Sequence, residues 1–128
     1  MKRFRVLRHI FKFHGFWESV KIAVNGIGYL FAYHRNMRII FLLGIMAFLL
    51  GMNLKLTGIE LVALCITITV VFIAEMFNTA IELLIDTATK KYNVLIKLVK
   101  DIAAGVVLIA SLNALAVGYV LFFKKIFF

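Results

Sequence analysis

The chain contains no proline, a single cysteine and few acidic residues. Without proline, nothing in the sequence forces a break inside a helix, and one cysteine, Cys65, excludes an internal disulfide. Only 6 Asp and Glu residues stand against 15 Lys and Arg residues, and charged residues make up 16% of the 128 positions. Soluble domains have about 25% charged residues, so the composition favours an integral membrane protein.

Apolar residues make up 64% of the chain, and the mean hydropathy is +1.04. At about 20 residues per crossing, the chain has room for three crossings and one amphipathic segment. We therefore predict an all-α membrane protein with a basic interfacial region over residues 1–38 and a three-helix transmembrane domain over residues 39–128. The spans are predicted at about residues 39–54, 59–86 and 94–123. Three helices enclose little space, so a sizeable site is expected to need more than one copy of the chain.

The N-terminal region carries apolar residues at helical spacing with basic residues between them. This pattern is typical of an amphipathic segment lying on a membrane, and we predict one over residues 1–15. A second interfacial helix is predicted over residues 16–35, with Trp17, Tyr29 and Tyr33 suited to the headgroup region.

Two helix starts carry capping signals. Thr57 and Glu60 fit a capping box at the start of the second span, because the two residues can bond reciprocally to each other's backbone N–H groups. Asn93 is the predicted N-cap of the third span.

Positive charge is distributed unevenly. With a cytoplasmic N-terminus, twelve Lys and Arg residues fall on the cytoplasmic side and three on the other, namely Lys55, Lys124 and Lys125. This asymmetry predicts a multi-pass membrane protein with its N-terminus on the cytoplasmic side. Beside three spans, the basic N-terminal region indicates attraction to anionic lipid rather than to nucleic acid.

One stretch of the second span is unexpectedly polar. Glu75, Glu82 and Asp86 fall within about 40° of one another around a helix, and Asn78 lies about 60° from Glu75. Glu75 follows Glu60 by 15 residues, or about 22 Å, which places it just short of the cytoplasmic boundary of a core about 30 Å thick. Three carboxylates and an amide are therefore predicted to share one stripe at the inner interface.

On the third span, Lys100 and Asp101 precede a mostly apolar run, so this pair is predicted to lie at the same interface. One interpretation is structural, with Glu82 or Asp86 paired to Lys97 or Lys100. An ion or proton path through Glu75 is another, since carboxylates inside membranes commonly mark such paths. The third is an enzyme acting between a lipid hydroxyl and a cytosolic nucleotide, and the residues alone leave the enzyme and the transporter level.

Two stretches of the sequence resemble those of a known protein family. AEMFNTAIELLID (Ala74 to Asp86) and KDIAAGVVLIA (Lys100 to Ala110) closely resemble the prokaryotic diacylglycerol kinase family, which includes the undecaprenol kinases of Gram-positive bacteria. The patterns E-x-x-N-[ST]-A-I-E-x-x-x-D and K-D-x-A-A-G are both matched, and the resemblance covers about residues 16–123. It implies a small three-helix membrane lipid kinase that uses ATP and Mg²⁺ and forms a homotrimer with active sites shared between subunits.

The resemblance also implies roles for individual residues. Glu75 matches the general base that takes the proton of the lipid hydroxyl, with Asn78 as its catalytic partner, and Glu82 matches a carboxylate that holds the magnesium. The remaining polar positions match a nucleotide site formed by Asp86, Lys100 and Asp101.

One element departs from the family pattern. His34 in HRNMR occupies the position of a second metal-binding glutamate, while Asn36 and Arg38 match the element and are assigned to the lipid substrate. Imidazole is a poor ligand for Mg²⁺, so either Glu18 or another subunit compensates, or metal binding is weakened, or the protein is a non-catalytic lipid-binding member. The stretches HRNMRI and KDIAAG, with Ala104 where the diacylglycerol kinases usually have serine, resemble the undecaprenol kinase branch more closely. The resemblance therefore favours undecaprenol as the acceptor, with diacylglycerol as the alternative.

Overall fold

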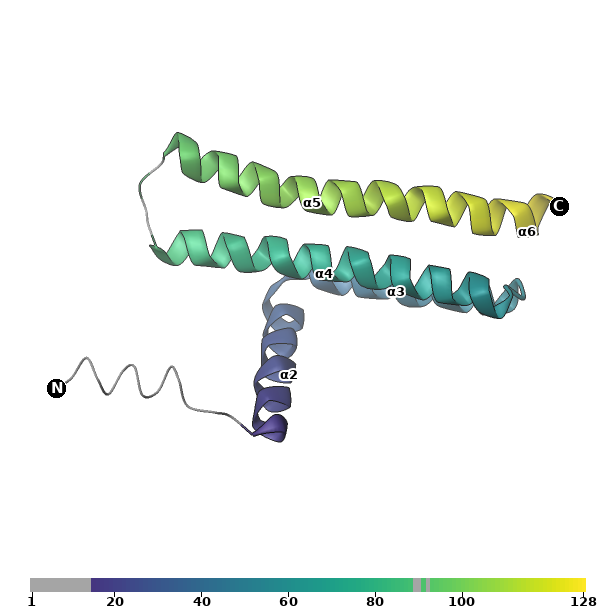
Figure 1. Ribbon diagram of the computed structural model, residues 1–128, viewed down its shortest axis with the longest axis horizontal. Coiled ribbons are helices and arrows are strands. Elements are labelled where there is room, and N and C mark those ends of the chain that lie inside the picture. Colours follow the sequence, from purple (N-terminus) through teal and green to yellow (C-terminus); the bar gives the residue numbers. More distant parts are fainter. Residues whose placement is uncertain (1–14, 89–90, 92) are drawn as a thin grey trace. The chain divides into compact units, whose positions relative to one another are not determined.

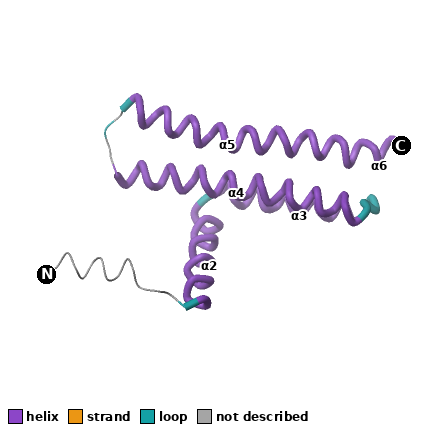
Figure 2. The backbone as a smooth tube through the Cα atoms, in the orientation of Figure 1, coloured by secondary structure: helices purple, strands orange, loops and turns teal. Residues whose placement is uncertain are grey.

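The computed structural model describes residues 15–88, 91 and 93–128, and all the regular structure among them is helical (Figure 2). Most of the segment predicted over residues 1–15 lies outside the described residues. The chain divides into two compact units, Met1–His34 and Arg35–Phe128.

The first unit contains one described helix, α2 (Phe16–Tyr33). It ends where His34 adopts an extended backbone, with φ −116° and ψ 111°, although the His34 N–H still donates to the Leu30 carbonyl at 2.8 Å. The helix predicted over residues 16–35 is confirmed to within two residues at its end, and its place at the membrane interface stays a prediction.

The second unit contains three long helical segments (Figure 1). The first is α3 (Arg35–Asn53), the second is α4 (Gly58–Ala88), and the third joins α5 (Val94–Gly118), the π-helical η1 (Tyr119–Phe123) and α6 (Lys124–Phe127). Each is long and apolar enough to cross a membrane. The three predicted long apolar helices are therefore confirmed, and their crossing of a membrane stays a prediction.

Two helices extend beyond the predicted spans. The helix α3 begins at Arg35, ahead of residue 39, and the last helical segment continues past residue 123 to Phe127. A helix satisfies its own backbone hydrogen bonds whatever the polarity of its side chains, so charged residues such as Arg38 and Lys124 do not end it. The bounds of the spans within the membrane stay predictions.

The predicted caps are present. The Thr57 N–H donates to Glu60 Oε2 at 3.2 Å and the Glu60 N–H donates to Thr57 Oγ1 at 3.4 Å. At the start of α5, Asn93 Oδ1 accepts from the Leu95 N–H at 3.0 Å. Both helix starts are therefore fixed by local sequence.

The turn between α3 and α4 was not predicted in detail. The Leu56 N–H donates to the Gly51 carbonyl and the Lys55 N–H to the Met52 carbonyl, which is the hydrogen-bond pattern of a Schellman helix end. Lys55 has a φ of 57°, a conformation that glycine adopts at lower cost. This turn reverses the chain and makes α4 antiparallel to α3.

Small residues let α3 approach α4 closely. A Cβ added at Gly44 would lie 2.8 Å from Ile68 Cγ2, and one at Gly51 would lie 3.1 Å from Leu64 Cδ2, both on α4. Beyond Gly44, the Phe41 and Phe72 rings pack with centroids 6.3 Å apart. These contacts fix the register of the two helices, which is typical of spans packed through small residues.

Candidate active site

The polar stripe predicted on the second span is present on α4. Glu75 is buried, with 6% of its surface exposed, and Asn78 follows it toward the end where α4 leads to α5. Asn78 Nδ2 donates to Glu82 Oε1 at 3.4 Å, one turn further on. The helix thus links an amide to a carboxylate and places a buried carboxylate one turn before them.

Glu75 has no ion-pair partner among the described residues. The buried hydroxyl of Thr79 donates to the Glu75 backbone carbonyl at 2.9 Å, which leaves the carboxylate uninvolved. Thr79 was not singled out from the sequence, although its position in the matched motif was a signal. A buried carboxylate without a cation is costly, so Glu75 is better explained by function than by packing.

Two ion pairs lie near the ends of α4 and α5 that face the connection between these helices. Lys100 Nζ on α5 contacts Asp86 Oδ1 on α4 at 2.9 Å, and Lys97 Nζ contacts Asp101 Oδ2 at 2.9 Å. The structural interpretation is therefore correct for Asp86, since its partner is Lys100. Exposed pairs of this kind contribute only about 0–1 kcal/mol, so an anionic ligand can recruit Lys100 at small cost.

The first turn of α3 lies at the height of Glu75. Arg38 precedes Phe41 by three residues and Glu75 follows Phe72 by three, and the two phenylalanine rings are in contact. The helices α3 and α4 run antiparallel with the same rise per residue. Arg38 therefore lies level with Glu75, and Asn36 lies level with the turn that follows Glu75. Both side chains are exposed.

His34 belongs to the first unit, and its ring lies 6.2 Å from that of Tyr29, measured between centroids. Its assignment as a metal ligand therefore stays a prediction.

The residues present were tested against the expected magnesium. No group of three or more His, Cys, Asp or Glu side chains arranged to hold a metal occurs in the part of the chain that the structure describes. Mg²⁺, however, is often bound by only one or two carboxylates together with substrate phosphates and water. Asn78 Oδ1 is buried and accepts no hydrogen bond from the described residues, and Glu82 lies beside it, so these oxygens fit as a partial ligand set.

The sequence of this chain is similar to those of known proteins. The family model described as prokaryotic diacylglycerol kinase matches residues 21–122. A diacylglycerol kinase from Synechocystis sp. is 39% identical over 101 residues, which is 78% of this chain and 58% of that protein. An undecaprenol kinase from Bacillus subtilis is 30% identical over 112 residues, covering 88% of this chain and 82% of that protein. The chain therefore spans little more than half of the first relative and most of the second.

Proposed function

Because the chain belongs to the prokaryotic diacylglycerol kinase family, we propose that it is an ATP- and Mg²⁺-dependent kinase that phosphorylates the hydroxyl of a membrane lipid. The observation that carries the proposal is Glu75, a buried carboxylate in a span with no ion-pair partner among the described residues. Such a group, two turns from a second carboxylate with an amide between them, is suited to proton transfer at the edge of the membrane.

In the proposed reaction, the lipid hydroxyl oxygen attacks the γ-phosphorus of ATP. The bond from that phosphorus to the β-phosphate oxygen breaks, ADP leaves, and Glu75 takes the hydroxyl proton. Asn78 orients Glu82 through the 3.4 Å hydrogen bond. Phosphoryl transfer depends mainly on positioning and charge neutralisation, which explains why so few groups suffice.

Three further residues bind the nucleotide in this proposal. Lys100 leaves Asp86 to contact a phosphate, and Asp101 and Asp86 flank the nucleotide. Glu82 and Asn78 Oδ1 would hold the Mg²⁺, which neutralises phosphate charge when bound. Asn36 and Arg38 stand at the level of Glu75 and are assigned to the lipid headgroup.

The acceptor is one of two lipids. The sequence around Ala104 favours undecaprenol, while the Synechocystis relative named a diacylglycerol kinase shares more identity with this chain than the Bacillus undecaprenol kinase does. We also propose a homotrimer with shared sites, a cytoplasmic N-terminus and active site, and an inner-membrane location. His34 supports a second candidate, a non-catalytic lipid-binding protein, because imidazole is a poor Mg²⁺ ligand.

The test is transfer of labelled phosphate from ATP by the purified protein in micelles, with undecaprenol and diacylglycerol offered separately, with and without Mg²⁺. We expect Mg²⁺-dependent labelling of lipid and its loss by about 10²- to 10⁴-fold in Glu75→Gln. Glu60→Gln is the matched control, because glutamine also completes a capping box and Glu60 lies at the opposite end of α4. A folded protein that labels neither lipid would leave the non-catalytic candidate.

A further inference from the structure

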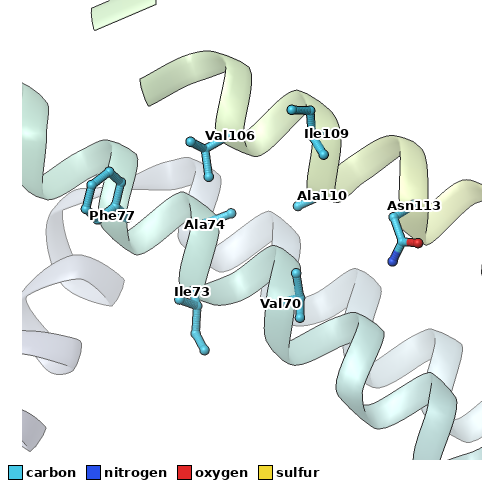
Figure 3. Close-up of a pocket in the computed structure, with 8 residues that line it drawn as sticks. All are labelled: Val70, Ile73, Ala74, Phe77, Val106, Ile109, Ala110 and Asn113. Carbon is cyan, nitrogen blue, oxygen red and sulfur yellow. The ribbon is translucent and has the colours of Figure 1, made fainter. Parts of the chain in front are cut away.

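Three contacts fix the register of α4 against the third helical segment. Two ion pairs join the helices near their ends, Asp86 with Lys100 and Glu60 with Lys125. Between these pairs, the buried Ala74 and Ala110 face each other in the groove between α4 and α5 (Figure 3). Because antiparallel helices have the same rise per residue, all three contacts place Ser111 level with Ala74 and Glu75.

Ser111 and Glu75 also face the same space. Ser111 lines an apolar cavity of about 450 Å³ between α3, α4 and α5. The α4 wall of this cavity includes Ile68 and Val71, and both lie within about 40° of Glu75 around the helix. Glu75 and Ser111 are therefore directed toward the interior of the three helices from neighbouring walls and at one height.

The separation of the two helices allows contact between these side chains. Ala74 and Ala110 are buried where α4 meets α5, and such short side chains allow an interaxial distance near the lower end of the usual range, about 8 Å. An extended glutamate places its carboxylate oxygens about 3.5 Å beyond its Cβ, given the usual bond lengths. The Glu75 carboxylate can therefore reach a hydroxyl on the facing helix.

Other hydrogen-bond donors near Glu75 are engaged or exposed. Three side chains of α4 donate within their own helix: Thr67, Asn78 and Thr79. Arg38 on α3 is level with Glu75, but its side chain is exposed. The Ser111 hydroxyl makes no hydrogen bond among the described residues. A hydroxyl without a partner in an apolar environment is costly, as is a carboxylate, so each of these two groups supplies what the other lacks.

We propose that Ser111 is a positioning residue for Glu75. When the substrates are bound, the Ser111 hydroxyl donates a hydrogen bond to one oxygen of the Glu75 carboxylate. This bond holds the other oxygen toward the lipid hydroxyl, whose proton it takes, and Ser111 keeps its own proton. Catalytic hydrogen bonds commonly tighten only in the complex with substrate. The inference rests on the proposed kinase function and adds a residue of α5 to it.

The test is phosphate transfer by Ser111→Ala in micelles, with the lipid that the unmodified enzyme phosphorylates. We expect kcat to fall about 10-fold or more, the effect of one hydrogen bond to a charged group. The KM values for ATP and lipid should stay unchanged, because Ser111 contacts neither substrate in this proposal. A raised KM for lipid with an unchanged kcat would overturn the assignment, since it would make Ser111 a lipid contact.

Thr67→Val is the matched control. It removes a hydroxyl from the wall of the same cavity, but one that donates to the Ala63 carbonyl of its own helix at 2.8 Å. This variant should leave kcat unchanged. A loss of kcat as large as that in Ser111→Ala would overturn the proposal, because any polar group in the cavity would then have the same effect.

Two further variants separate positioning from packing. Ser111→Thr keeps a hydroxyl and should retain most of the kcat that Ser111→Ala loses. In the Glu75→Gln background, Ser111→Ala should not lower the residual transfer further, because no carboxylate is left to position. An equal loss in both backgrounds, or no benefit of threonine over alanine, would overturn the inference.

Failure of this inference and failure of the kinase function give different results. Absence of Mg²⁺-dependent transfer to any lipid by the unmodified protein would overturn the kinase function itself. Transfer that Ser111→Ala leaves unaffected would overturn the role of Ser111 alone.

Discussion

Replacing Glu75 by glutamine should make the protein more stable while it makes the enzyme inactive. The two side chains have nearly the same shape and helix propensity, so the replacement creates no cavity. It breaks no ion pair, because Glu75 has none among the described residues. What changes is the cost of holding a carboxylate inside the span, where 6% of the residue is exposed.

The size of the expected gain in the free energy of unfolding depends on how deep Glu75 lies in the membrane. A carboxylate at the middle of a span costs about 2.5–3.5 kcal/mol on insertion scales. Glu75 lies about 22 Å along α4 from Glu60 in a core of about 30 Å, so it stands roughly midway between the centre and the nearer boundary. We expect Glu75→Gln to raise the free energy of unfolding by about 1 kcal/mol.

The assay is denaturant unfolding of the purified protein in micelles, followed by circular dichroism, beside the phosphate-transfer assay. Glu60→Gln again serves as the control, since Glu60 lies at the end of the span and its contact with Lys125 is long, at 3.7 Å. A loss of stability of 1 kcal/mol or more in Glu75→Gln would refute the reasoning. It would mean that the carboxylate has a stabilising partner, and the structural interpretation would then hold for Glu75 as it does for Asp86.

Three further predictions test other parts of the molecule. Lys55→Gly should raise the free energy of unfolding by about 0.5–1 kcal/mol, because Lys55 has a φ of 57° that costs an L-residue about 1–2 kcal/mol; unfolding in micelles measures this, and a decrease would contradict it. Asp86→Asn breaks the 2.9 Å contact to Lys100 and should change stability by less than about 1 kcal/mol while altering the KM for ATP; unchanged ATP kinetics would separate Asp86 from the nucleotide. His34→Glu should lower the Mg²⁺ concentration needed for half-maximal transfer, because oxygen ligands suit Mg²⁺, and an unchanged Mg²⁺ titration would exclude His34 from metal binding.

Much of the fold was predictable because its signals are local. Apolar runs of sufficient length give the three spans, and the caps at Thr57, Glu60 and Asn93 depend only on residues two or three positions away. The stripe of Glu75, Asn78 and Glu82 is likewise a property of one helix, since residues three, four and seven apart share a face. The end of α2 at His34 was less predictable, because no glycine or proline marks it.

What the sequence could not determine depends on contacts between helices. The sequence allowed Asp86 to pair with either Lys97 or Lys100, and only the packing of α4 against α5 selected Lys100. Local sequence therefore determined which helices form and which face of α4 is polar. The close approach at Gly44 and the antiparallel register decided which residues of other helices meet that face. That choice depends on side-chain packing between segments far apart in the chain, so the sequence alone could not make it.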